Sequence, residues 1–301
     1  MKDAARLVLY LAGVLLVGAL LAPLLFWLGQ WVIAQGFWPR LARYDFHSYF
    51  DRAVLIAALV LLWPLFRSFR VRSWGDLELE KNPFAGADLG VGFAAAALPL
   101  LCGGAVLAAL PIYSLRHPFL WQKMPAVLIA ALVVPVLEEL LFRGFILGVL
   151  LRSCSRVGAV VLTSALFAIV HFVKPPAFLP NESVHWWTGF IALGRSFAQF
   201  GEPLLFVGGF CTLFVVACIL ADARLLTRSL WLPIGLHAGW IFANGVFSRA
   251  AHRDLLALPW LGKDFLVGIV PLCIALLSWA LMRGWVNYPR RRPLPSPPRT
   301  H

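Results

Sequence analysis

Charged residues are scarce in this sequence, and their scarcity excludes a soluble globular domain. Only 13% of the 301 residues are charged, whereas 61% are hydrophobic and the mean hydropathy is +0.82. Soluble domains carry about 25% charged residues. The composition therefore predicts an all-α, polytopic transmembrane helical bundle, because runs of about 20 apolar residues form helices that span a bilayer.

Cysteine is also sparse, and no C-x-x-C pair occurs among the five cysteines, so neither a disulfide framework nor a thiolate metal site is indicated. The sequence has no internal repeat and no segment with the composition of a soluble domain. We interpret it as one membrane-embedded unit in three parts. These are N-terminal helices in 1–124, a core in 125–248, and a last helix with a basic, proline-rich tail in 249–301.

About eight stretches are apolar and long enough to be spans. The second is short and is expected to extend towards Phe46. The first has a basic start, but its apolar run is too long for a signal-peptide core, so we expect an uncleaved anchor. The predicted spans are 5–34, 53–67, 89–112, 125–150, 157–173, 204–222, 229–248 and 264–283.

The net charge of +12 does not indicate nucleic-acid binding, because the basic residues are spread over nearly every loop. Lysine and arginine are more numerous on the side that holds both ends of an eight-span chain, which predicts cytoplasmic termini. The loop from Lys174 to Pro203 is then external. Its aromatic residues Trp186, Trp187 and Phe190 favour the lipid headgroup level, so part of this loop is expected to lie along the membrane surface.

The stretch VLEELLFRGF places three charges inside the fourth predicted span. Of the fourteen acidic residues, only Glu138 and Glu139 fall well inside a span. An ionisable side chain at a helix centre costs roughly 2.5–3.5 kcal/mol, so it usually faces protein or water and has a function. Glu139 and Arg143 share one helical face and are predicted to form a structural ion pair. Glu138 is turned about 100° away and is the predicted reactive carboxylate.

Two histidines, His171 and His237, also fall inside predicted spans. Either residue alone is as compatible with a helix-to-helix hydrogen bond as with catalysis. With about 1.5 Å per residue, however, Glu138, His171 and His237 all lie roughly 13–22 Å from arginines at the predicted cytoplasmic ends of their helices. Three helices thus bring one carboxylate and two imidazoles to similar depths, which indicates a common site.

These residues form a recognisable set. The motif E-E-x-x-x-R at Glu138, Glu139 and Arg143, the motif F-x-x-x-H at Phe167 to His171, and a third helix with His237 resemble the three motifs of the CPBP family. This family contains the CAAX-protease and bacteriocin-processing intramembrane proteases, also called abortive-infection proteins. The resemblance covers about 125–248 and agrees with the eight-span architecture.

One position departs from the family pattern. The third motif commonly has asparagine four residues after histidine, where this chain has Ile241. Asn244 lies seven residues after His237, within about 20° of the same helical face, and is the candidate substitute.

The resemblance implies hydrolysis of a peptide bond in a membrane-associated or lipidated protein or peptide, as in CAAX processing. Glu138 and His171 would activate water, and His237 with Asn244 would stabilise the oxyanion. A catalytic zinc site commonly has one carboxylate and two histidines as protein ligands, and this set matches Glu138, His171 and His237. The family is often called a metalloprotease family. The sequence has no H-E-x-x-H motif, and we favour activation of water by glutamate without metal.

Two alternatives stay open. A proton-coupled transporter would also bury carboxylates and histidines, but its expected repeated halves with broken helices are not visible. A catalytically silent membrane scaffold would tolerate loss of the glutamate, whereas this chain keeps every core charge. The compact, strongly apolar chain suits a bacterial inner membrane.

Overall fold

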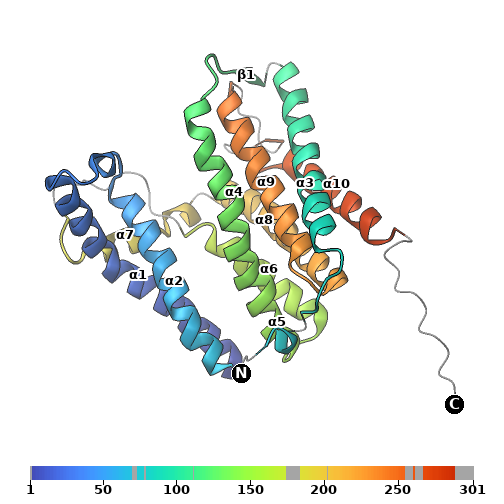
Figure 1. Ribbon diagram of the computed structural model, residues 1–301, viewed down its shortest axis with the longest axis horizontal. Helices are drawn as coiled ribbons and strands as arrows, with labels where there is room; N and C mark the ends of the chain where they lie inside the picture. Colours follow the sequence, from blue (N-terminus) through green and yellow to red (C-terminus); the bar gives the residue numbers. More distant parts are fainter. Residues whose placement is uncertain are drawn as a thin grey trace. The chain divides into compact units, whose positions relative to one another are not determined.

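A computed structural model describes residues 2–69, 73–77, 79–110, 112–173, 184–201, 203–254, 260–261 and 267–288. The chain divides into two compact units, each made mainly of helices (Figure 1). Unit 1 comprises Met1–Asp76 and Ala168–Val207, and unit 2 comprises Leu77–Phe167 and Gly208–His301.

Unit 1 contains a long helical hairpin and a short helix packed against it. Its helices are α1 (Lys2–Ala34), η1 (Pro39–Arg43), α2 (Phe46–Ser68), α7 (Thr188–Arg195) and η6 (Ala198–Gly201). Asp45 caps α2 by accepting a hydrogen bond from the backbone N–H of Ser48, which explains why this helix begins at Phe46. A β-carbon on Gly189 of α7 would overlap the backbone of Ala19 in the middle of α1. The centre of the 174–203 loop therefore packs against an apolar span, and residues 174–183 and 202 lie outside the described residues.

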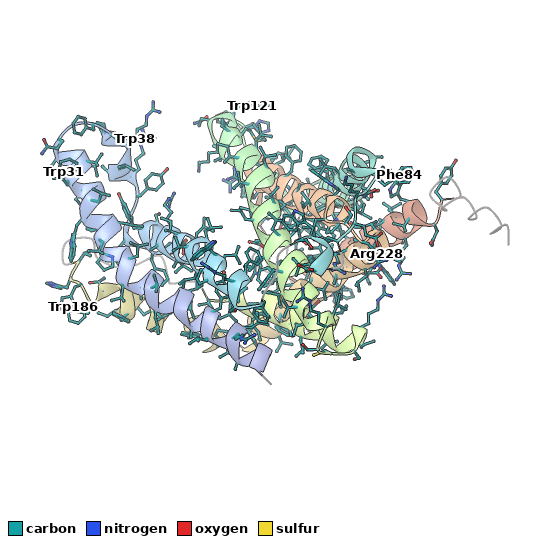
Figure 2. The ribbon with its side chains drawn as sticks, turned by 60° about the horizontal axis from the view of Figure 1, so that its bottom comes forward. Trp31, Trp38, Phe84, Trp121, Trp186 and Arg228 are labelled. Atoms are coloured by element: carbon teal, nitrogen blue, oxygen red, sulfur yellow. The ribbon has the colours of Figure 1, made fainter. Side chains whose placement is uncertain are left out.

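Exposed aromatic side chains mark one end of the α1–α2 hairpin. Trp31 is 56% exposed and Trp38 is 60% exposed, and both lie where α1 gives way to η1 (Figure 2). Indole rings of this kind prefer the lipid headgroup level.

Unit 2 is a bundle of helices that carries the charged motif. It contains η2 (Gly75–Leu77) in part, α3 (Ala85–Ala109), η3 (Trp121–Lys123), α4 (Met124–Glu139), η4 (Leu140–Ile146), α5 (Leu147–Leu151), most of α6 (Arg156–Val170) and of α8 (Pro203–Thr227), α9 (Trp231–Ala250) and α10 (Ile269–Val286). A small antiparallel pair, β1 (Tyr113–Leu115) with β2 (Ala251–Arg253), follows α3 and α9. The sequence did not predict this pair of strands.

Glycines bring α3 and α9 into direct backbone contact. A β-carbon on Gly235 or Gly239 would overlap the carbonyl of Leu89 or Phe93, and one on Gly92 would lie 2.7 Å from the Leu232 carbonyl oxygen. Small residues four apart permit this close approach of membrane helices. The contacts advance together along both helices, so α3 and α9 run parallel, in agreement with their places as third and seventh of the eight predicted spans.

Every predicted span corresponds to a helix, and the all-α prediction is confirmed apart from the short strands. Among the described residues, six helices are long and apolar enough to cross a membrane. The two remaining spans differ in physical character. Helix α6 has only 15 residues, and α9 has 20 residues but is less apolar, because it carries polar side chains including His237 and Asn244.

Two aspartates that lie near the ends of their own helices hydrogen-bond to side chains of α10. Asp222 of α8 accepts hydrogen bonds from Arg283 Nε and Nη2, both at 2.8 Å, and from Trp279. Asp88, in the first turn of α3, is fully buried and accepts from Trp285 Nε1 at 2.8 Å. These contacts hold α10 against α8 and α3.

Candidate active site

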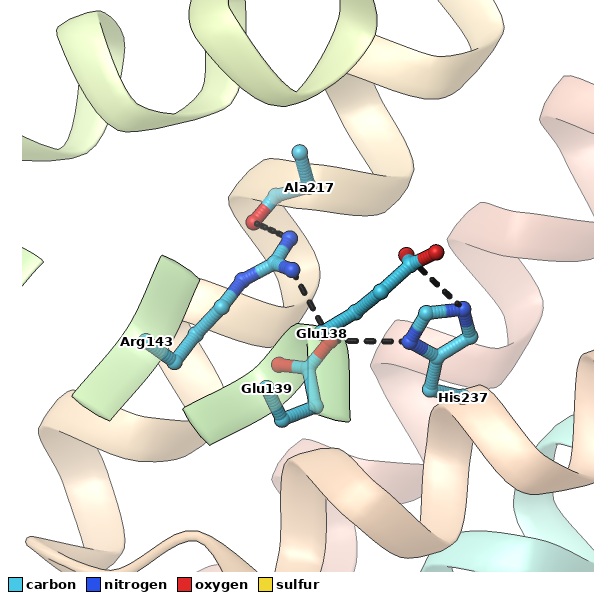
Figure 3. Close-up of polar contacts among 5 residues, drawn as sticks. All are labelled: Glu138, Glu139, Arg143, Ala217 and His237. Atoms are coloured by element: carbon cyan, nitrogen blue, oxygen red, sulfur yellow. Dashed lines mark hydrogen bonds and ion pairs between the residues drawn. The ribbon is translucent and has the colours of Figure 1, made fainter. Parts of the chain in front are cut away.

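Glu139, the last residue of α4, lies at the centre of the buried polar cluster (Figure 3). Its side chain is fully buried, and one oxygen, Oε1, has two partners. Arg143 Nη1 donates to it at 2.8 Å, and His237 Nδ1 lies 2.8 Å from it. The carboxylate thus joins α4 to α9, across 98 positions of sequence.

The chain widens into a seven-residue π-helix, η4, directly after Glu139. Such wide turns are rare and are often found at functional sites. This one contains Arg143, whose side chain is fully buried. Arg143 Nη2 donates to the Ala217 carbonyl oxygen of α8 at 3.2 Å, and the guanidinium lies 4.3 Å from the centre of the Phe167 ring. The predicted ion pair is present, and it also binds two further helices.

His237 is oriented by Glu139 and faces Glu138. Because Nδ1 is held by the Glu139 carboxylate, this nitrogen carries the proton, and Nε2 is left to face the open side. Nε2 lies 3.9 Å from Glu138 Oε2. The side chain of Glu138 is 29% exposed, compared with 9% for His237 and 0% for Glu139. Glu138 is therefore the most exposed side chain of the cluster, although its Oε2 atom, which faces His237, is buried.

The other two predicted site residues are placed differently. His171 lies in a turn that begins directly after α6, belongs to unit 1, and is half-buried. Asn244 is half-buried on α9, the same continuous helix as His237. Seven residues of helix correspond to about 10 Å along the axis, so Asn244 lies about two turns from His237. Their catalytic roles stay predictions.

A zinc ion would need three protein ligands at this site. In the part of the chain that the structure describes, no three His, Cys, Asp or Glu side chains come together as a metal-binding group. Glu138 and His237 supply two candidate ligands, and His237 Nδ1 is already held by Glu139. The third predicted ligand, His171, belongs to the other unit, and no step below depends on a metal.

Two features of the site were missed in the sequence. The hydrogen bond between Glu139 and His237 gives Glu139 a second role beyond the ion pair with Arg143. The motif Gly235-x-x-x-Gly239, which brackets His237, is a signal that was available in the sequence. It is typical of close helix packing, and in the structure it presses the histidine-bearing turn of α9 against α3.

Fold and site together define a helical membrane protein with a buried carboxylate–histidine cluster. Residues 120–243 match the family model described as Type II CAAX prenyl endopeptidase Rce1-like. The matched segment includes the cluster residues Glu138, Glu139, Arg143 and His237, and it ends one residue before Asn244. The match confirms the resemblance to the CPBP/CAAX protease family over this part of the chain, which is less than half of its length. No curated protein and no solved structure matches the chain.

Proposed function

We propose that the protein is an intramembrane endopeptidase that hydrolyses a peptide bond of a membrane-associated or lipidated protein, with Glu138 as the residue that activates water. The family match supports peptidase activity. The observation that carries the assignment is the 3.9 Å separation between Glu138 Oε2 and His237 Nε2.

That separation suits one bound water. It is too long for a direct hydrogen bond. A water about 2.8 Å from each atom completes a triangle with the two side chains, and both hydrogen bonds then have ordinary lengths. In this proposal water and substrate approach from the side on which the Glu138 side chain is partly exposed.

We assign stabilisation of the oxyanion to His237. Its Nδ1 faces the Glu139 carboxylate and its Nε2 faces Glu138. A hydrogen bond from His237 to the oxyanion therefore has to come from Nε2–H, so in this mechanism both ring nitrogens carry a hydrogen when the oxyanion forms.

The reaction follows from these positions. Glu138 removes a proton from water, and the hydroxide oxygen bonds to the scissile carbonyl carbon while the carbonyl oxygen becomes an oxyanion that accepts from His237 Nε2–H. The carbon–nitrogen bond then breaks, and the proton held by Glu138 passes to the leaving amine. A carboxyl end and an amine end are released. His171 is the proposed second partner of the water.

Glu139 and Arg143 act as positioning residues. Arg143 donates a hydrogen bond to Glu139, and Glu139 holds the His237 ring with Nε2 directed towards Glu138. We further propose that the site opens to the cytoplasm of a bacterial inner membrane and that both termini lie on that side, in agreement with the distribution of basic residues.

The test replaces Glu138 by glutamine and measures hydrolysis of a fluorogenic peptide with a prenylated CAAX terminus in detergent micelles. Glutamine keeps the shape but cannot accept the proton, so turnover should fall by about 10² to 10⁴. The matched control is Glu80→Gln, which removes an exposed carboxylate that pairs with Arg228 at 2.7 Å and should leave turnover unchanged. Full proteolysis by the Glu138 variant would end the proposal and favour the transporter alternative.

A further inference from the structure

A second polar site lies in unit 2, at the other end of the motif helix. A cavity of about 440 Å³ is lined by Leu151, Arg156, Arg224, Leu225 and Arg228. It is formed where α5 ends, α6 begins and α8 ends. Leu151 follows Glu139 by twelve residues, on the order of 15 Å along the helix, so this cavity is separate from the carboxylate–histidine cluster.

Three arginines from two separate segments of the chain line this cavity. Arg224 is only 1% exposed, and its Nη2 is held by the Leu77 carbonyl oxygen. Arg156 is exposed at the first residue of α6. Arg228 follows α8 in a left-handed conformation with φ of 50° and pairs with Glu80 at 2.7 Å. Glu80 balances one of the three charges, which leaves an excess of positive charge.

The charge and the wall of the cavity together define its ligand. Guanidinium groups bind phosphate oxygens through paired hydrogen bonds, and arginine is favoured over lysine where this geometry matters. Leu151 and Leu225 add an apolar surface beside the arginines. A volume of about 440 Å³ falls within the usual range of small-molecule sites, about 300–1,000 Å³.

We propose that this cavity binds a phosphate-bearing anion, supplied by the headgroup of an anionic phospholipid such as phosphatidylglycerol. The cavity lies at the ends of apolar helices, where headgroups lie when those helices cross a bilayer. Basic pockets between membrane helices on the cytoplasmic side bind anionic headgroups for this reason. The leucines would contact the first acyl carbons while the arginines hold the phosphodiester.

Thermal unfolding of the full chain in a neutral detergent tests the proposal without any need for activity. Phosphatidylglycerol should raise the melting temperature of the wild type, and phosphatidylcholine should not. The double variant R156Q/R228Q should lose the shift. Its affinity for phosphatidylglycerol should fall roughly tenfold or more, because one hydrogen bond to a charged group contributes about a tenfold change in affinity. The matched control is Arg152→Gln, which removes an exposed arginine from the same helix end but not from the cavity.

Further arms identify the source of the phosphate and guard against misfolding. Inorganic phosphate that stabilises the wild type and R152Q, but not the double variant, would support the phosphate site with a soluble ligand. If the double variant does not fold, Arg156→Gln alone provides the test, since this side chain is exposed. An equal shift with phosphatidylcholine, or an unchanged shift in the variant without Arg156 and Arg228, would overturn the proposal.

Discussion

Replacing Arg143 with alanine should destabilise the fold more than any change to Glu138. The substitution leaves the fully buried Glu139 carboxylate without its arginine partner, removes the hydrogen bond to the Ala217 carbonyl oxygen, and removes the guanidinium that lies over the Phe167 ring. Breaking a buried ion pair by removing one partner costs about 3–5 kcal/mol. The Ala217 and Phe167 contacts overlap with this figure rather than add to it, because one side chain makes all three.

The expected loss is large enough to measure by thermal unfolding in detergent. For a unit of about 150–250 residues, 3–5 kcal/mol corresponds to a fall in melting temperature of roughly 6–20 °C. Glu138→Gln is the comparison, since its partly exposed side chain should change the melting temperature by less than about 2 °C. Arg143→Lys should recover only part of the lost stability, because a single ammonium group cannot donate to the Glu139 carboxylate and the Ala217 carbonyl oxygen in the way the two guanidinium nitrogens do. Equal destabilisation by the Arg143→Ala and Glu138→Gln changes would refute the division of roles.

Three further outcomes are expected. Purified protein should contain less than one zinc per chain and keep its proteolytic activity after chelation; stoichiometric zinc, with activity lost on removal and restored on return, would reverse this preference. Asn244→Ala should lower turnover less than tenfold in the peptide assay, because about 10 Å of helix separates it from His237, and a loss equal to that of the Glu138 variant would restore its oxyanion role. Reporter fusions should place His301 in the cytoplasm and the 174–203 loop outside, and an external C-terminus would overturn the topology.

Hydropathy predicted the helices of this protein well because each apolar run is long and separated by polar turns. All eight predicted spans contain a helix, and the short second span was expected to extend towards Phe46, where α2 begins. The burial of α7 against α1 was not predicted. Its aromatic residues indicated the membrane surface, whereas the contact between Gly189 and Ala19 and the buried cluster that Ala192 shares with α1 show that the segment packs against a span.

The site was predictable where it depends on local spacing. Glu139 and Arg143 are four residues apart, and their ion pair follows from that spacing. The bond from Glu139 to His237 joins residues 98 positions apart, and the π-helix places Arg143 against both Glu139 and Ala217. Both depend on how distant helices meet, which no single-helix pattern records. The comparison of depths nevertheless selected His237 as a neighbour of Glu138, because residues on different spans that lie equally far from the same membrane surface lie at one level of the bundle.

The glycine contact between α3 and α9 sets limits on how this protein can change. Because the backbones touch at Gly235 and Gly239, a larger residue there would push the two helices apart rather than rearrange a side chain. His237 would move with α9, and a displacement of about 1 Å at a reacting group can cost a factor of about 10² in rate. Diversification of substrate preference, in evolution or in the laboratory, should therefore fall on residues that face the open side of Glu138. Selection should hold the two glycines fixed even though neither touches substrate.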